Sequence, residues 1–439
     1  MNIENLKSLY TDKGCQKIFV KKLSPNDNSK NQVYLGGSFE ILNILPISEI
    51  ETVAAGDWKR ERFKAKINFS WIGDDCNLYP APNSQLILYP KYPEVRFSGF
   101  LTGCENAPSE LMTQRLADRL LFLSVSKDGR ILGYVASPTS TVAKEFNQSN
   151  TTIELGVFKV IELLETTNSK LRLIQELKRI HSQDWITSKR LDAHRNILPC
   201  DSSNCGGYTL EAELGIIPNG YSEPDYLGWE VKQFGVKNFE HINSSVITLM
   251  TPEPTDGIYV SKGVDKFIYQ YGYKDKSGKS GREDRLNFGG IHKVGVRHAT
   301  TNLKMELIGF EAEEGKIRNT NGRIALIDKK GDEAASWSFS AMLLHWNRKH
   351  NQACFVPSLS ETNSDRKYKY GNNVMLGIGT DFQFFLKAMS IGNIYYDPGI
   401  KMESASTKPK IKRRSQFRIV SRNLSSLYKT NELVDITNY

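Results

Sequence analysis

Apolar and polar residues alternate over several short runs near the start of the chain, a pattern typical of strands with one buried face. Residues 17–27 (KIFVKKLSPND) predict a strand that continues into a polar turn, and residues 62–72 (RFKAKINFSWI) predict a half-buried strand. Further short strands are predicted at residues 86–89, 96–101 and 131–136. Residues 109–123 predict a helix. This mostly β pattern predicts a compact barrel or sandwich over residues 1–145.

The pattern changes towards the middle of the chain. Residues 137–152 are rich in Ser, Thr and Asn, which suits a linker, and residues 153–181 have a helical pattern with one apolar stripe. We therefore expect a linker and a helix over residues 146–180, followed by a second domain over residues 181–439.

Strand-like and helix-like patterns both occur in this second domain. Residues 337–351 (WSFSAMLLHWNRKHN) predict an amphipathic core helix with a solvated face. The polar residues on that face are expected to be surface decoration: His345, Arg348, Lys349 and His350. Strands are predicted at residues 246–250 and 353–357, and a further helix at residues 382–391. The whole chain therefore predicts a mixed α+β fold.

Composition sets limits on this picture without changing it. A chain of 439 residues is long enough for two or three domains, and its charged fraction of 24% is ordinary for a soluble protein. No apolar run reaches membrane-spanning length, and the first residues include acids and no hydrophobic signal core. We expect a cytoplasmic protein with no membrane partner. The six cysteines are scattered, so reduced thiols are expected, and no second pair completes a zinc site with Cys200 and Cys205.

The charge of the chain points towards a polyanion. The net charge is +9, and residues 401–422 contain eight basic residues against the single acid Glu403. A basic balance of this kind fits a nucleic-acid partner, although many basic proteins bind none.

Three of the carboxylates within residues 206–233 stand in an order, together with the lysine of this stretch, that suggests chemistry: Glu211, Asp225, Glu230 and Lys232. Trp229 begins a β-prone run, in which Glu230 and Lys232 point to the same face because they are two residues apart. Asp225 and Glu230 near the start of a strand can hold a divalent cation, and an amine beside them can assist water in attacking a phosphodiester. Glu211 lies on a helix-like segment and could orient the metal shell. Spacing alone equally allows a charge pair on a wet sheet face.

The order of these residues resembles that of the PD-(D/E)xK nucleases, in particular the MvaI/BcnI restriction endonucleases, which are related to the repair nickase MutH. Asp225 and Glu230-Val231-Lys232 stand in the family's catalytic order, and Glu211 stands in the place of its helix glutamate. Further matches are ITLMT at 247–251, WSF at 337–339 and FRI at 417–419. Together they span residues 182–439.

This resemblance implies a Mg²⁺-dependent type II restriction enzyme with a PD-(D/E)xK catalytic domain. Asp225, Glu230 and the carbonyl of Val231 would hold the metal, and Lys232 would position or deprotonate the attacking water. Glu211 would support the metal shell. The enzyme would be a monomer that cuts the two strands of double-stranded DNA in turn, with a cognate methyltransferase in the same system.

In the resembled family, base recognition comes from the late part of the chain. Asp397 and Arg418 stand at matching positions, whereas Gly399 replaces a family arginine. The residues that could substitute for this arginine are Lys401, Arg413 and Arg414. Arginines suit guanine edges and an aspartate can accept from cytosine, which fits a short G·C-rich site of the CCWGG or CCSGG type.

A second resemblance concerns the start of the chain. Residues 17–21 (KIFVK), Leu23-Ser24, Asn26-Asp27 and Gln32 are similar to the opening of the N-terminal domain of the EcoRII restriction enzyme. That likeness implies a B3-like pseudobarrel that grips DNA with two arms. The expected contact residues are Lys21, Lys22 and Asn26 in the first arm and Arg96 in the second. Such a domain could bind a second copy of the site as an effector, or only add affinity.

Two other functions remain open at this point. The chain could be a non-catalytic DNA-binding regulator in which the acidic cluster is structural, or a MutH-like repair nickase. The additional N-terminal domain argues against the nickase.

Overall fold

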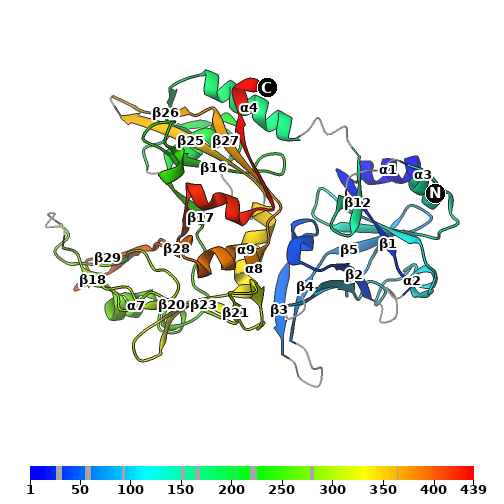
Figure 1. Cartoon of the computed structure of the whole chain (residues 1–439), viewed down its shortest axis with the longest axis horizontal. Helices are drawn as coiled ribbons and strands as arrows, with labels where there is room; N and C mark the ends of the chain where they lie inside the picture. Colours follow the sequence, from blue (N-terminus) through cyan, green and yellow to red (C-terminus); the bar gives the residue numbers. More distant parts are fainter. Residues whose placement is uncertain are drawn as a thin grey trace. The chain divides into compact units, whose positions relative to one another are not determined.

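A computed structural model describes the chain except for residues 26–31, 55–60, 91–93, 150–153, 164–168, 203, 218–224, 277–280 and 363, and the side chains of 347 and 348. The chain divides into two compact units, Met1–Asn168 and Ser169–Tyr439. The first unit is blue to cyan in Figure 1, and the second is green to red.

Two sheets and three α-helices build the first unit. The seven-stranded sheet has the order β11(Glu154–Leu155), β12(Phe158–Glu162), β1(Lys17–Leu23), β9(Arg119–Val125), β10(Ile131–Ala136), β5(Phe69–Ile72), β6(Leu78–Pro80). The five-stranded sheet has the order β2(Gln32–Gly36), β8(Glu94–Ser98), β7(Gln85–Tyr89), β4(Arg62–Lys66), β3(Glu49–Val53). The α-helices are α1(Ile3–Asp12), α2(Ser109–Thr113) and α3(Thr141–Gln148), and η1(Phe39–Asn43) is a 3-10 turn.

The core of this unit lies where α1 and α3 meet the longer sheet. Leu6 and Tyr10, four residues apart on α1, share a cluster with Phe146 of α3 and Phe122 of β9. Asn2 caps α1 by accepting a hydrogen bond from the main-chain N–H of Asn5.

Several strand predictions for this unit are confirmed, including those of β1 and β10. One helix prediction and one strand prediction are wrong. The predicted helix at 109–123 is helical only over α2, and β9 follows it. The run RLLFLSV of β9 is almost wholly buried, and a short apolar run of this kind does not distinguish a buried strand from a buried helix. The predicted strand at 62–72 is two strands in different sheets, β4 and β5.

The segment 146–180 also differs from the prediction. Among its described residues it is not a linker followed by one helix, because β11 and β12 extend the first sheet, α4(Ser169–Ser182) is helical, and α3 covers half of residues 137–152. Among the described residues the strands of the first unit form two sheets and no closed barrel, so the B3-like description stays a prediction.

The second unit is organised around a mixed sheet with the order β13(Ile186–Thr187), β26(Arg366–Tyr370), β25(Gln352–Thr362), β27(Asn373–Ile378), β32(Thr430–Asp435). β16(Glu230–Gly235) pairs with β25 in parallel, and Glu230 lies opposite Ala353. α4 and α5(Cys205–Glu213) contribute Leu177 and Leu210 to the core cluster that also contains Val231. Figure 1 shows α4 beside the strands of this sheet.

Smaller sheets complete the second unit. They are β14(Lys189–Leu191) with β15(Ile197–Pro199), β17(Val246–Met250)–β31(Phe417–Val420)–β28(Ile394–Tyr396), β18(Tyr273–Lys274)–β19(Arg285–Gly289)–β29(Gly399–Glu403)–β30(Lys410–Lys412), β20(Lys304–Ile308)–β23(Arg323–Ile327)–β24(Glu333–Ser338), and β21(Phe310–Glu311) with β22(Lys316–Ile317). The remaining helices are α6(Ile258–Ser261), α7(Val264–Tyr271), α8(Phe339–His350) and α9(Phe382–Ser390), with 3-10 turns η2(Ile242–Ser244), η3(Ser421–Leu427) and η4(Ile436–Asn438).

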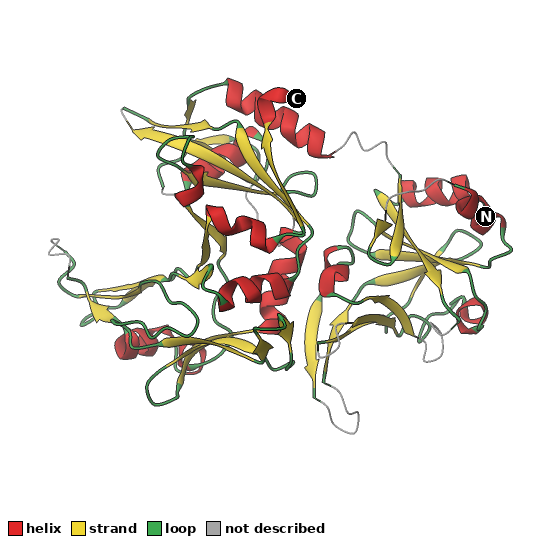
Figure 2. Cartoon of the chain, in the orientation of Figure 1, coloured by secondary structure: helices red, strands yellow, loops and turns green. Residues whose placement is uncertain are grey.

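Both units contain helices and strands, which confirms the mixed α+β fold (Figure 2). The predicted helix at 337–351 begins later than expected, because Trp337 belongs to β24 and Ser338 caps α8. In the described part of the chain, no helix combines the length and the apolar character needed to cross a membrane.

Cys200 and Cys205 form a disulfide at the start of α5, which corrects the expectation of reduced thiols. Hydrogen bonds also hold this region, because Ser188 donates to the carbonyl of Cys200 over 2.8 Å and Tyr370 donates to that of Gly206 over 2.7 Å.

We expect Cys200→Ser or Cys205→Ser to lower the free energy of unfolding by about 2 kcal/mol, because the bridge closes only a short loop. Thermal unfolding with and without reductant measures this effect. Cys76→Ser, which changes an exposed free cysteine, is the control. Unfolding of the wild type that does not respond to reductant would contradict the prediction.

Candidate active site

A tight turn brings Asp225 back to the beginning of β16. Tyr226 and Trp229 exchange main-chain hydrogen bonds of 2.9 and 2.8 Å around Leu227 and Gly228. Both turn residues have positive φ, 50° and 85°, as a two-residue hairpin turn requires. The turn allows a carboxylate oxygen of Asp225 to accept from the main-chain N–H of Val231 over 3.3 Å. The turn therefore brings Asp225 and Glu230, five residues apart in the chain, into one site.

Glu230 and Lys232 lie on the same face of β16, as their spacing predicts. The Lys232 Nζ lies 2.7 Å from the Glu230 Oε1, and the Glu230 side chain is only 2% exposed. Burial opposes the charge of Glu230, but Lys232 and other nearby cations outweigh it and lower the pKa of this carboxyl. Glu230 therefore stays ionised beside a protonated amine.

Asp225 and Glu230 are close enough for their carboxyl groups to share a hydrogen bond. Burial, the charge of Glu230 and this shared bond raise the pKa of Asp225 to about 7. With both groups ionised, the buried Glu230 Oε2 accepts no hydrogen bond from the described residues. Since a buried oxygen of this kind needs a partner, either a proton shared with Asp225 or a cation must satisfy it. The pair thus fits an oxygen-preferring divalent metal.

Glu211 approaches the same pair from α5. Gly206 makes this approach possible, because a Cβ there would lie 2.8 Å from the side chain of Gln233 on β16. Burial and the charge of Glu230 raise the pKa of Glu211, and Lys349 and Lys232 offset part of this effect. Across the described ranges, no group of three or more His, Cys, Asp or Glu side chains could hold a metal.

Two residues of α8 reach this site, although the sequence predicted them to be surface decoration. The Lys349 Nζ lies 3.4 Å from the Glu230 Oε1 and 3.9 Å from the Asp225 Oδ1. The buried His350 stacks on Trp346, and burial followed by the charge of Lys232 lowers its pKa to about 3. Their position follows from the pairing of β16 with β25, which starts just after α8. No local signal in the sequence reveals that pairing.

Comparison with known proteins decides between an endonuclease and a non-catalytic DNA-binding protein. A family model, the MvaI/BcnI restriction endonuclease family, matches residues 174–428, more than half of the chain. The chain belongs to the MvaI/BcnI restriction endonuclease family. It is therefore a type II site-specific endonuclease. The match lies within the second unit and leaves the first unit outside it.

Solved structures of the restriction endonuclease MvaI resemble the chain over a similar length. Its complex with cognate DNA is 20% identical, covers 62% of this chain and 99% of the MvaI chain, and gives a TM-score of 0.45. MvaI without DNA is 18% identical with the same coverage and a TM-score of 0.34. A search of the curated proteins gives no match.

Metal binding by this MvaI/BcnI-family endonuclease should depend on pH. If Asp225 is a metal ligand, a bound metal must displace the proton of this carboxyl, whose pKa is about 7. Affinity should therefore rise by about tenfold per pH unit below neutrality and level off above it. Calorimetric titration with Mg²⁺ in the absence of DNA measures this dependence. An affinity that is constant between about pH 6 and pH 8 would contradict the shifted titration of Asp225.

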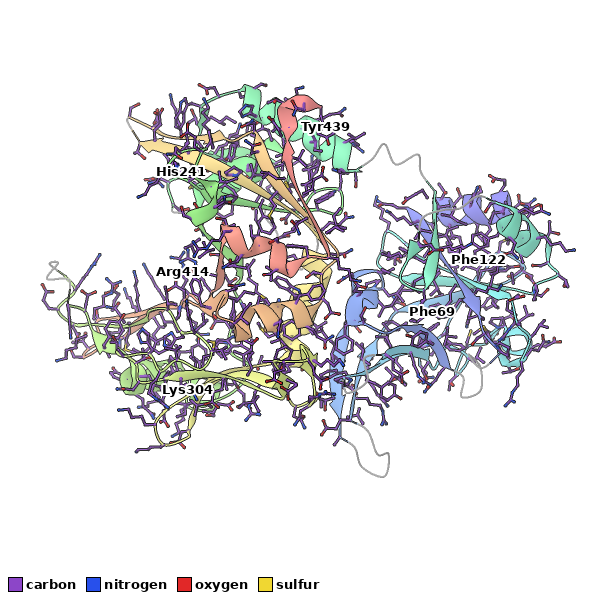
Figure 3. All side chains as sticks on the ribbon, in the orientation of Figure 1. Phe69, Phe122, His241, Lys304, Arg414 and Tyr439 are labelled. Atoms are coloured by element: carbon purple, nitrogen blue, oxygen red, sulfur yellow. A yellow bond between two sulfur atoms is a disulfide. The ribbon has the colours of Figure 1, made fainter. Side chains whose placement is uncertain are left out.

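The residues predicted to read DNA lie late in the second unit, on or next to the strands β28 to β31. Asp397 follows β28 directly, and its Oδ2 lies 2.5 Å from the Nη1 of Arg418 on β31. The two side chains therefore neutralise each other's charge. Arg414 accepts at its carbonyl from the N–H of Gly399 over 2.8 Å, and its side chain passes beside Gly399. Figure 3 labels Arg414, which is exposed and follows β30.

Two further basic residues accompany this group. Arg413 is exposed next to Arg414. Lys401 on β29 lies among other cations, and reduced solvation together with the charges of Arg285 and Arg282 lowers its pKa. Such a concentration of positive charge on neighbouring strands fits contact with phosphates.

The predicted contacts of the first unit have different surroundings. Lys21 is only 7% exposed, and its Nζ donates to the carbonyl of Lys22, so Lys22 is the exposed lysine of this pair. Lys22 lies 2.9 Å from Asp118. Arg96 lies 3.2 Å from Glu94 and stacks over the ring of Tyr89.

Asn26, also predicted in the first arm, lies outside the described residues. The structure therefore leaves the two-arm hypothesis untested.

Proposed function

We propose that the chain is a Mg²⁺-dependent endonuclease that cleaves double-stranded DNA at the site formed by Asp225, Glu230 and Lys232. One observation carries this proposal. A buried, ionised Glu230 has one oxygen 2.7 Å from the Lys232 amine, and with Asp225 also ionised its other oxygen accepts no hydrogen bond from the described residues. A structural ion pair does not require the second oxygen to remain open beside another carboxyl group.

The ligands that we propose for Mg²⁺ are Asp225, Glu230 and the carbonyl of Val231. When bound, the ion stabilises negative charge developing on the phosphate and makes water a stronger nucleophile. The main-chain N–H of Val231 donates to Asp225 and orients its carboxylate. Glu211, on α5, adds further negative charge near Glu230. Three acids around one ion favour a cation that prefers oxygen ligands.

Lys232 acts as a positively charged group that positions water and the phosphate. Burial favours its neutral form, but the charges of Glu230, Asp225 and Glu211 outweigh burial and raise its pKa. In the metal-free protein Lys232 is thus fully protonated and cannot accept a proton. It can assist deprotonation of water only after a cation has neutralised the surrounding acids.

For recognition, we propose that Arg418 and Asp397 read base edges within a short G·C-rich site such as CCWGG or CCSGG. Lys401, Arg413 and Arg414 would contact bases or phosphates beside them. Supporting this proposal, the five residues lie on or next to β28 and β31 of one sheet and β29 and β30 of another, four strands that follow one another in the chain. A monomer would cut the strands in turn, and a methyltransferase would protect the same site.

For the first unit, we propose a B3-like DNA-binding role, with residues 1–168 rather than 1–145 as its extent. It would bind a second copy of the site or add affinity for the first. The exposed position of Lys22 and the half-buried position of Arg96 support this role.

Purified protein incubated with supercoiled plasmid and increasing Mg²⁺ tests the proposed function. We expect nicked circles to precede linear DNA, and run-off sequencing of the products to give one short site. An absence of Mg²⁺-stimulated cleavage on mixed-sequence DNA would favour a DNA-binding regulator instead. Nicking restricted to hemimethylated sites would favour a repair nickase.

A further inference from the structure

We propose that Lys349 occupies the cation position of the active site in the metal-free protein, and that a divalent metal must displace it. This inference rests on the proposed function, because it requires Asp225 and Glu230 to be the metal ligands. It assigns to Lys349 a role distinct from that of Lys232, although both lysines contact Glu230.

The first argument is geometric. The Lys349 Nζ lies 3.4 Å from the Glu230 Oε1 and 3.9 Å from the Asp225 Oδ1, so one ammonium bridges the two carboxylates proposed to bind metal. Lys232 lies 2.7 Å from Glu230 and, among the described residues, forms no ion pair with Asp225. Lys349 is thus the amine that stands between the two acids, where a bridging cation would lie.

The second argument concerns exposure and freedom to move. The Lys349 side chain is 31% exposed, compared with 18% for Lys232 and 2% for Glu230. Lys349 therefore lies on the solvent side of the buried acid. A lysine carries a compact charge on a flexible four-carbon stem, so its amine can leave the site without movement of α8.

The third argument is electrostatic. The three carboxylates of the site already face two lysines, Lys232 and Lys349, in the metal-free protein. A doubly charged ion bound to Asp225 and Glu230 would lie within a few ångströms of the Lys349 amine and repel it strongly. Because Lys349 is the more exposed and less closely bound lysine, it leaves the site while Lys232 stays. The Lys349 ammonium neutralises the two carboxylates in the absence of metal, and the metal displaces it on binding.

Calorimetric titration with Mg²⁺ in the absence of DNA tests this displacement. We expect Lys349→Met, which removes the charge but keeps most of the side-chain volume, to bind Mg²⁺ about five- to tenfold more tightly than the wild type. Lys349→Arg, which keeps the charge, should bind no more tightly than the wild type. Lys170→Met is the matched control, because Lys170 has similar exposure and pairs at 2.6 Å with Glu432 instead.

A second measurement uses the unmodified protein, so it does not depend on the folding of a variant. Brief acylation of amines followed by peptide mass spectrometry reports how accessible each lysine is. We expect saturating Mg²⁺ to increase labelling of Lys349 several-fold and to leave Lys170 unchanged.

The outcomes separate this inference from the proposed function. Equal or weaker Mg²⁺ binding by Lys349→Met, or labelling of Lys349 that does not respond to Mg²⁺, would overturn the displacement while leaving the metal site in place. Mg²⁺ binding in none of the proteins would overturn the proposed function as well.

Discussion

Asp225→Asn should reduce DNA cleavage by at least about a thousandfold, because it removes a charged metal ligand while keeping the shape of the side chain. The same change should make the metal-free protein more stable at about pH 8. The folded-state pKa of Asp225 is raised from 3.8 to about 7, so the folded protein holds this proton more tightly than the unfolded chain does. Stability linked to that proton is fully present below the unfolded pKa and is lost as pH rises through the folded pKa.

Asparagine does not titrate, so the variant avoids this loss above neutrality. We expect a gain on the order of 2 kcal/mol, reduced from the full shift because Asp225 is partly exposed and coupled to other charges. Denaturant unfolding with chelator at acidic and alkaline pH measures the gain. The variant should equal the wild type in acid, where Asp225 is neutral. A variant less stable than the wild type at alkaline pH would show that ionised Asp225 does not destabilise the folded protein.

Lys232→Met should lower the cleavage rate by about 10²- to 10⁴-fold, in the range expected for a positioned proton-transfer group. Since Lys232 is not a proposed metal ligand, Mg²⁺ binding at alkaline pH should be retained. Loss of the amine 2.7 Å from Glu230 should raise the pKa of that carboxyl, because Lys232 is the strongest positive influence on it. Mg²⁺ affinity should therefore begin to fall at a higher pH than in the wild type.

Single-turnover cleavage and calorimetry across pH distinguish these effects. Lys170→Met again serves as the control, because it removes a lysine that pairs with Glu432. If Lys232→Met cleaves at the wild-type rate, then Lys232 is only a structural partner of Glu230. If the variant instead loses Mg²⁺ binding at every pH, then its loss of cleavage says nothing about proton transfer.

The sequence predicts the local half of the active site well. Glu230 and Lys232 lie on one face of a strand because strand geometry fixes residues two apart, and Asp225 joins them through a short turn. Gly228 supplies one of the positive φ values in that turn. The relation of Glu230 to Lys232 follows from periodicity alone, whereas the turn at Leu227 and Gly228 was not predicted from the sequence and is a finding of the structure.

The remaining half depends on contacts between distant segments. Lys349 and His350 reach Glu230 because β16 pairs in parallel with β25, more than a hundred residues later in the chain. An amphipathic pattern identifies the buried face of α8 but not what its last turn approaches. The β9 strand was likewise predicted as a helix, because tertiary pairing with β1 and β10 decides its conformation.

Diffraction from crystals soaked in Mn²⁺, with anomalous scattering used to locate the metal, tests the central claim most directly. Mn²⁺ substitutes for Mg²⁺ at oxygen-rich sites and can be located without ambiguity. We predict one peak in contact with oxygens of Asp225, Glu230 and the Val231 carbonyl, with the Lys349 amine moved away. A crystal with full Mn²⁺ occupancy elsewhere and no peak between Asp225 and Glu230 would contradict the account.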